Sequence, residues 1–160
     1  MKAIGTIFVL ALTTTAIGAC GTGGAKTHST TAASSPSPPT TAALIAAADP
    51  ICAQVNAAIS AHPVTKLQDL PRIAEILGPA EREGAERLAA LTPPHVLAGE
   101  WKRFVADALV VAEDTQKMTQ WGKLHDGARE RALLGAGGNA RRELREIAAR
   151  RGFSECSHLD

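Results

Sequence analysis

The chain has 160 residues, a formal net charge of +1 and only 3% aromatic residues, with no tyrosine. A net charge this close to zero lacks the basic field of a nucleic-acid-binding protein, so we expect no nucleic acid among its partners. The cysteines and histidines match no common zinc, haem or nucleophile motif. We therefore expect no metal, no other cofactor and no enzymatic activity.

Residues 1–19 read as a signal peptide. Met1-Lys2 supplies a positive charge, and the uncharged stretch 3–17 follows it, as in the basic and apolar regions of a secretory signal. This stretch is shorter than the roughly 20 apolar residues that span a bilayer. We expect the segment to direct export and then to be removed.

The signal ends in Ile17-Gly18-Ala19-Cys20, which resembles the lipobox of bacterial lipoproteins: an aliphatic residue, two small residues and a cysteine. The resemblance implies that Cys20 receives a diacylglycerol group and becomes the first residue of the mature chain. The protein would then be lipid-anchored on the outer face of the bacterial cell membrane. The alternative is ordinary cleavage after Ala19, but Ile17 is too large for an A-x-A-like site.

Residues 20–41 comprise this cysteine and a segment rich in Ser, Thr, Gly and Pro. It contains no aliphatic side chain larger than alanine apart from proline, so it cannot bury a core, and we expect a disordered linker. Fully extended, it would reach roughly 70 Å. The same composition is typical of O-glycosylated stalks, and the sequence leaves open whether sugar is attached.

Residues 42–160 are expected to form one all-α domain, because alanine is abundant and β-branched runs are scarce. In the first predicted helix, the apolar side chains recur at the three- and four-residue spacing of a core-facing stripe. They are Leu44, Ala48, Cys52, Val55 and Ile59. The pair Asp49-Pro50 interrupts the stripe. It predicts either a helix that begins at Pro50, with Asp49 as N-cap, or a kink there.

Two more helices are predicted between residues 66 and 122. The first covers about 66–91, with Pro71 in its first turn and a bend or break at Gly78-Pro79. The second runs from Pro94 to Gly122, and its apolar residues form an uninterrupted seam spaced by four and three. The residues of this seam are Leu97, Trp101, Phe104, Ala108, Val111, Thr115 and Met118.

The last helical region is less regular. Leu124, Ala128, Leu133 and Leu134 predict helix after Asp126, and the glycines of residues 135–138 are expected to break it. Asn139 would cap a final helix, which Gly152 ends. Phe153 would fold back onto that helix, as in a Schellman motif.

Short connections predict an up-down bundle of about four helices. The two cysteines of the domain, Cys52 and Cys156, lie near its opposite ends in sequence. In an oxidising compartment they have only each other, which predicts a disulfide. Two buried free thiols are the alternative. In this topology the pair meets only if Cys52 lies near the start of its helix, as a start at Pro50 would require.

Several motifs suggest sites but lack the necessary context. Gly135–Ala140 matches the glycines of a dinucleotide-binding turn, but no parallel strand precedes it. Glu155 and His158 have the spacing of a di-iron motif, but a second copy and further glutamates are missing. Acidic and basic residues alternate on the second predicted helix and indicate an exposed face with local ion pairs. They are Glu81, Arg82, Glu83, Glu86 and Arg87.

The last helix carries a candidate basic face that could contact anionic lipid head groups or wall polymers. The arginines of this face are Arg141, Arg142, Arg145, Arg150 and Arg151. The alternative explanation is charge matching between helices of the bundle, because acids exceed bases between Asp69 and Asp114.

The whole arrangement resembles the many small lipoproteins of actinobacteria: lipobox, Ser/Thr/Pro linker, and an alanine-rich helical domain with a cysteine near each end. The resemblance implies a location and a fold, not a chemistry. We expect a non-catalytic interaction or scaffold module of the cell envelope, bound to an envelope protein or wall polymer. The alternative is a binder of a small apolar ligand between helices, in a space left by Ala80, Gly84 and Ala108.

Overall fold

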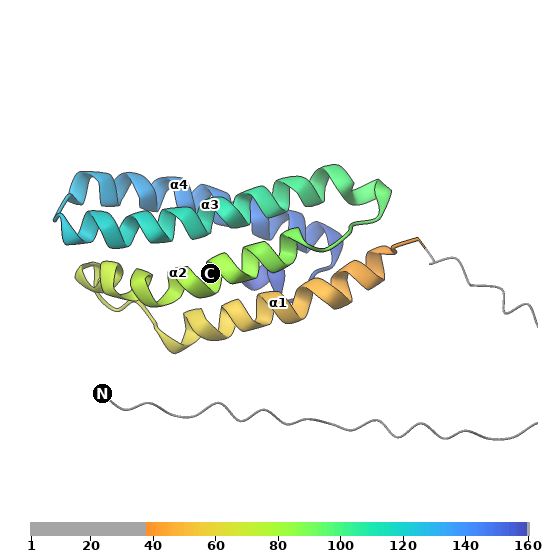
Figure 1. Cartoon of the computed structure of the whole chain (residues 1–160), viewed down its shortest axis with the longest axis horizontal. Coiled ribbons are helices and arrows are strands. Elements are labelled where there is room, and N and C mark those ends of the chain that lie inside the picture. Colours follow the sequence, from red (N-terminus) through yellow and green to blue (C-terminus); the bar gives the residue numbers. More distant parts are fainter. Residues whose placement is uncertain (1–37, 160) are drawn as a thin grey trace, which may run out of the picture. The chain divides into compact units, whose positions relative to one another are not determined.

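The computed structural model describes residues 38–159, which lie within one compact unit. The predicted signal peptide, Cys20 and most of the expected linker lie outside this range. Four long helices form an up-down bundle in which successive helices run in opposite directions (Figure 1). They are α1 (Thr41–Ala61), α2 (Leu70–Ala89), α3 (Ala98–Lys123) and α4 (Gly127–Arg151), with short 3-10 turns η1 (Leu67–Asp69), η2 (His95–Leu97) and η3 (Cys156–His158). The expectation of an all-α bundle is confirmed.

The helix ends follow from side chains and glycine at defined positions. Thr40 caps α1, since its hydroxyl accepts from the Ala43 amide at 3.1 Å, and Asp126 caps α4 in the same way. At the other end of α4, Gly152 adopts the left-handed conformation, with φ of 80°. The Phe153 amide then donates to the Ala148 carbonyl at 3.0 Å. This is the predicted Schellman motif, and it turns the chain back toward the bundle.

The prediction of a start or kink at Pro50 was wrong about the start, because α1 begins at Thr41 and Pro50 lies inside it. The alanine-rich turns before Pro50 favour helix strongly enough to continue through it. Proline removes one bond to the Ala46 carbonyl, and Ala46 is exposed, so water can replace the missing donor. α2 likewise continues through Gly78-Pro79 without a break.

The predicted break at residues 135–138 was also wrong. α4 is continuous from Gly127 to Arg151, and Asn139 lies within it rather than at a cap. Glycine weakens a helix by about 1 kcal/mol relative to alanine but does not forbid it. Packing of α4 along α3 outweighs that weakness, with Ala140 and Leu144 buried.

The core divides along the bundle axis into two parts. The disulfide half contains the start of α1, the end of α2, the start of α3, the end of α4 and the C-terminal tail. Its buried side chains form one apolar cluster around Cys52, Phe104, Leu144, Phe153 and Cys156. The hollow half contains the opposite ends of the same helices. Its buried residues lie outside that cluster and include Ile73, Leu77, Val111 and Met118.

Candidate functional site

The C-terminal tail closes the disulfide half. Cys52 and Cys156 form the predicted disulfide, with Cα atoms 5.0 Å apart. Cys52 lies in the middle of α1 rather than near its start, so the geometric reason for the prediction was wrong. The bond forms because the chain folds back after Gly152 and brings η3 against both α4 and α1.

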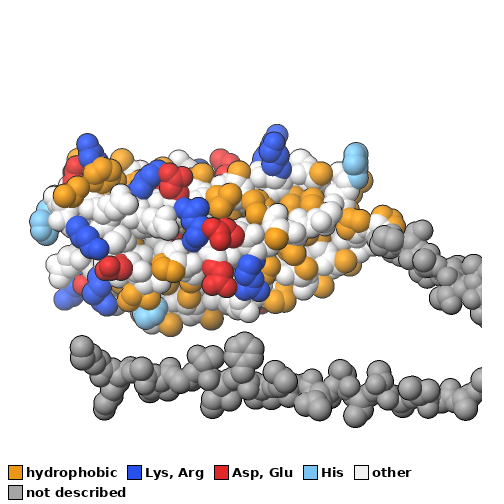
Figure 2. Space-filling view, in the orientation of Figure 1, with side chains coloured by type: hydrophobic (Ala, Val, Ile, Leu, Met, Phe, Trp, Pro, Cys, Tyr) orange, Lys and Arg blue, Asp and Glu red, His pale blue; other side chains and the backbone are white. Residues whose placement is uncertain are grey.

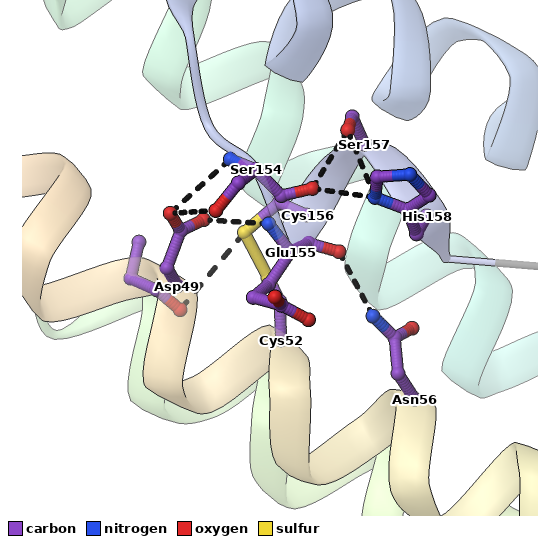
Figure 3. Close-up of a disulfide and its surroundings, with 9 residues drawn as sticks. Asp49, Cys52, Asn56, Ser154, Glu155, Cys156, Ser157 and His158 are labelled. Atoms are coloured by element: carbon purple, nitrogen blue, oxygen red, sulfur yellow. Dashed lines mark hydrogen bonds between the residues drawn. A yellow bond between two sulfur atoms is a disulfide. The ribbon is translucent and has the colours of Figure 1, made fainter.

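A polar network at the surface holds this tail against α1 (Figure 3). The Asp49 carboxylate accepts hydrogen bonds from the Ser154 amide at 3.1 Å, the Ser154 hydroxyl at 2.8 Å and the Glu155 amide at 3.1 Å. The Asn56 side chain donates to the Glu155 carbonyl at 2.9 Å. Asp49 is therefore a cap for the tail and not, as predicted, for α1. Sequence reasoning missed this role because the partners are more than 100 residues apart.

Stacked aromatic rings fill the same half. Trp101 and Phe104 of α3 have ring centroids 5.0 Å apart, and Phe153 of the tail stacks on both. These rings contribute large buried areas and favourable stacking. The predicted α3 seam is confirmed, since all of its residues except half-buried Thr115 are buried. With rings, tail and disulfide in place, the space beside Cys52 is only about 40 Å³. A groove of about 240 Å³, lined mostly by exposed residues, lies between α3 and α4 beside Asp107 and Arg150.

The hollow half contains a cavity of about 410 Å³. This volume lies within the range of small-molecule binding sites. All four helices and the connection between α1 and α2 contribute to its wall, and most of the contributing side chains are apolar. The lining residues are Ile59, His62, Pro63, Val64, Leu70, Ile73, Ala74, Leu77, Glu81, Val111, Asp114, Thr115, Met118, Leu133, Leu134, Gly137, Gly138 and Arg141.

Burial of the lining residues shows which side of the cavity is open. The fully buried ones, such as Ile73, Leu77 and Met118, belong to α2 and α3, which therefore form the floor. The exposed ones, such as Val64 and Gly138, belong to the α1–α2 connection and to α4. The mouth consequently opens between α1 and α4. In the disulfide half the C-terminal tail fills the space between α1 and α4. In the hollow half no described residue fills that space.

Small residues create the space, but not at the positions that the sequence suggested. A Cβ atom at Gly84 would lie 2.6 Å from Val55, so α1 and α2 meet closely there. The free space beside Gly84 and Ala108 is only about 40 Å³. At Gly138 a Cβ would meet nothing within 4 Å, and Ala74 lies on the floor. The glycines of residues 135–138, which we expected to break the helix, instead lie within α4 and leave its side of the cavity open.

The polar groups of the wall are two carboxylates, an arginine, the His62 imidazole and the Thr115 hydroxyl. Glu81, expected on an exposed face, is buried, and its Oε1 accepts from Arg141 Nη2 at 2.8 Å. Its Oε2 and the Oδ2 of Asp114 are buried without a hydrogen-bond partner among the described residues. Burial raises the pKa of Asp114; Lys117 opposes this shift and Glu113 adds to it. The wall thus holds buried acceptors in a mostly apolar surface.

The remaining charges of α2 are exposed or half-buried but do not form the local pairs that we expected. Arg82 donates to Gln116 of α3 at 3.1 Å, and Arg87 donates to Gln54 of α1. Both bonds join neighbouring helices. Glu83 and Glu86 are exposed.

Two of the five arginines of the candidate basic face bind acids on neighbouring helices. Arg141 pairs with Glu81 of α2, and Arg151 makes two bonds to the Glu100 carboxylate of α3 at 2.6 and 2.7 Å. The hydrogen bond from Arg151 lowers the pKa of Glu100. Arg142 donates to Asn139, Arg150 lies 4.0 Å from Glu146, and Arg145 is half-buried. Figure 2 shows acidic and basic side chains interspersed over the face it draws.

Other candidate features have structural roles. His158 Nδ1 lies 2.7 Å from the Ser154 carbonyl oxygen, so this histidine belongs to the tail turn. Among residues 38–159, no three His, Cys, Asp or Glu side chains come together as a metal site would require. α1 is long and apolar enough to cross a membrane by length and composition alone. In the bundle, however, its Leu44, Ile51 and Cys52 are buried against the other elements.

Comparisons with known proteins identify no relative. No protein-family model, curated protein or solved structure matches this chain. The bundle and its cavity are therefore the basis for a functional proposal.

Proposed function

We propose that this protein is a lipid-anchored module of the bacterial cell envelope whose helical domain binds a small apolar ligand in the hollow half. The observation that supports binding is the cavity of about 410 Å³, with its buried apolar floor on α2 and α3. Because the mouth is open, the apolar side chains of the wall face water, which is unfavourable. An apolar ligand would remove that surface from water. The role is one of binding rather than catalysis.

The anchor part of the proposal rests on the lipobox-like residues Ile17–Cys20, which precede the described domain. The disulfide fits an exported protein, since disulfides persist in oxidising compartments. A mass measurement of the protein isolated from membranes tests the anchor. We expect a chain that begins at Cys20 with a diacylglycerol adduct. An unacylated chain that retains residues 1–19 would contradict it.

The polar groups of the cavity wall limit the class of ligand that can bind. Buried Glu81 and Asp114 each hold one oxygen without a partner, and both are acceptors when ionised. A ligand with a hydrogen-bond donor, such as a hydroxyl or an amine, can satisfy them, whereas a carboxylate would add repulsion and desolvation. We therefore expect an apolar body with a neutral or cationic polar group. A long-chain alcohol should bind more tightly than the carboxylate of equal length.

A matched pair of glycine variants tests the ligand site. Gly135 and Gly138 lie on the same helix, and a Cβ atom would meet nothing within 4 Å at either position, but of the two only Gly138 lines the cavity. We expect Gly138→Leu to weaken binding of the neutral dye N-phenyl-1-naphthylamine by about tenfold or more, by narrowing the mouth. Gly135→Leu should bind as the parent does. Equal dye binding by parent and both variants would contradict the site.

The interaction or scaffold role is a second candidate, supported by the exposed arginines Arg142 and Arg150. Neither is held by a close bond to another helix. Contact with anionic polymers through these side chains would weaken steeply with salt. Binding of wall polymer that is unchanged in an Arg142→Gln, Arg150→Gln double variant would contradict this second role.

A further inference from the structure

The end of the hollow half exposes large apolar side chains on both of its connections. Val64 and Leu67 of the α1–α2 connection are 47% and 75% exposed, and Leu124 of the α3–α4 connection is 67% exposed. Leu134 of α4, at the cavity mouth, is 44% exposed. We call these four residues the apolar tip. Scattered exposed leucines are common, but a group that borders a cavity mouth indicates an interaction surface.

Contacts between the start of α2 and the end of α3 hold the two connections side by side. Figure 1 shows both connections at the same end of the bundle. Gly122 lies against Pro71 so closely that a Cβ there would come within 2.1 Å of the proline ring. Lys123 Nζ is 3.2 Å from the Glu75 carboxylate. Leu67 and Leu124 are therefore held on neighbouring segments, beside the lining residues Val64 and Leu134.

The position of the N-terminus allows this tip to reach a membrane. α1 begins in the disulfide half, at the end opposite the tip. The helices are roughly 30–40 Å long, at 1.5 Å per residue. The segment from Cys20 to Thr40 spans up to roughly 70 Å when extended. A domain anchored through Cys20 can consequently invert and place its far end on the same bilayer.

Charges beside the tip favour apolar over electrostatic contact. Lys123 pairs with Glu75, and Arg129 Nε lies 3.3 Å from Asp126 Oδ2 while its guanidinium stacks over Trp121. Exposed Lys66, Arg72 and Arg131 also lie at this end. Together with Asp69 and Glu130 they leave five bases against four acids, so the surface has no strong field that would select anionic lipids. Apolar side chains that enter the interface would supply the affinity.

We propose that the apolar tip of Val64, Leu67, Leu124 and Leu134 contacts the lipid bilayer and sets the cavity mouth at its surface, so that the apolar ligand passes between bilayer and cavity. This inference rests on the proposed ligand site and anchor. Transfer through such a contact spares the ligand a passage through water, which is unfavourable for apolar molecules. The bilayer is thus both the docking partner and the ligand reservoir.

Quenching by brominated lipid in phosphatidylcholine vesicles tests the contact. The full anchored chain is labelled with one fluorophore at Leu67→Cys, Leu124→Cys or Val96→Cys. Val96 is the control, because it is 82% exposed and lies on the α2–α3 connection at the other end. We expect quenching at positions 67 and 124 to exceed that at 96 by about threefold or more, with no need for phosphatidylglycerol. Equal quenching at all three positions, or none at 67 and 124, would overturn the proposal.

A second variant separates docking from ligand binding. Leu67→Ser with Leu124→Ser leaves the cavity lining unchanged, so dye affinity in solution should stay the same. Transfer of N-phenyl-1-naphthylamine from vesicles should slow by about tenfold, because both leucines lose their burial in the interface. Unchanged transfer with normal affinity overturns the docking alone. Absence of dye binding in the parent overturns the ligand site itself. Quenching that requires anionic lipid and disappears in Arg142→Gln would assign the contact to the basic face instead.

Discussion

The disulfide half and the hollow half are built from the same four helices but differ in what fills the space between α1 and α4. In the disulfide half, a fifth segment enters the seam between α1 and α4, held by the Cys52–Cys156 bond and the Asp49 carboxylate. In the hollow half the space between α1 and α4 stays open above a cavity of about 410 Å³. The disulfide half is therefore expected to supply most of the stability, and the hollow half is the site at which we propose that a ligand binds.

Removal of the disulfide should have the largest effect on stability. The bond joins residues 104 positions apart, and closing so long a loop stabilises by about 4–5 kcal/mol in the chain-entropy model. We expect a Cys52→Ser, Cys156→Ser variant to lose about that free energy of unfolding, measured by urea denaturation. Cys20→Ser is the control and should unfold as the parent does. A double variant as stable as this control would show that the tail is held without the bond.

Leucine truncation in each half compares their packing directly. Leu144→Ala in the disulfide half should cost about 4 kcal/mol, because dense packing prevents collapse around the vacated space. Leu77→Ala on the cavity floor should cost about 2 kcal/mol, since fewer atoms surround that side chain. Thermal or urea unfolding of both variants gives the difference. Equal losses would contradict the division of the core.

Alanine at two glycines should change stability in opposite directions. At Gly84 a Cβ would lie 2.6 Å from Val55, so Gly84→Ala should destabilise by about 1–3 kcal/mol. At Gly138 nothing is within 4 Å, so Gly138→Ala should stabilise by about 1 kcal/mol through helix propensity. A destabilised Gly138→Ala would mean that the α4 wall needs glycine for a reason besides open space.

The smallest expected effect is a pH dependence from Asp114. Burial raises the pKa of this carboxyl, so the folded state holds the proton more tightly and loses stability as pH rises through the folded pKa. Asp114→Asn should therefore be more stable than the parent at pH 7, by under about 1 kcal/mol. This advantage should vanish on acidification below the pKa of the unfolded chain.

A control for this effect lies on the same helix. The hydrogen bond from Lys117 lowers the pKa of Glu113, so Glu113→Gln should be less stable at neutral pH and should lose that deficit in acid. The two variants have opposite signs of pH dependence. Curves of the same sign would contradict the assignment of burial as the cause at Asp114.

Local sequence patterns predicted the bundle well. The α3 seam, Pro71 in the first turn of α2, and the Gly152–Phe153 turn each depend on residues close in sequence, so spacing and capping rules reach them. Those rules failed at Pro50 and at residues 135–138. There, neighbouring helix-forming residues and packing on other helices outweighed a weak local preference.

The features that define the site depend on contacts between distant residues. Asp49 binds the tail, and Glu81 is buried by its bond to Arg141. Each looks like an ordinary charged helix residue in sequence. We expected the cavity beside Gly84. Small residues also allow two helices to approach closely, however, and at Gly84 the position of Val55 produces a close contact instead of a cavity. The alternating charges around Glu81 do not indicate that this residue is buried.

Native mass spectrometry of protein isolated from its own membranes tests the central claim, ligand binding in the hollow half, most directly. The account predicts that the parent and Gly135→Leu carry a co-purified apolar molecule, which organic extraction releases, and that Gly138→Leu carries markedly less. The same molecule bound equally to all three proteins, or no bound molecule in the parent, would contradict it.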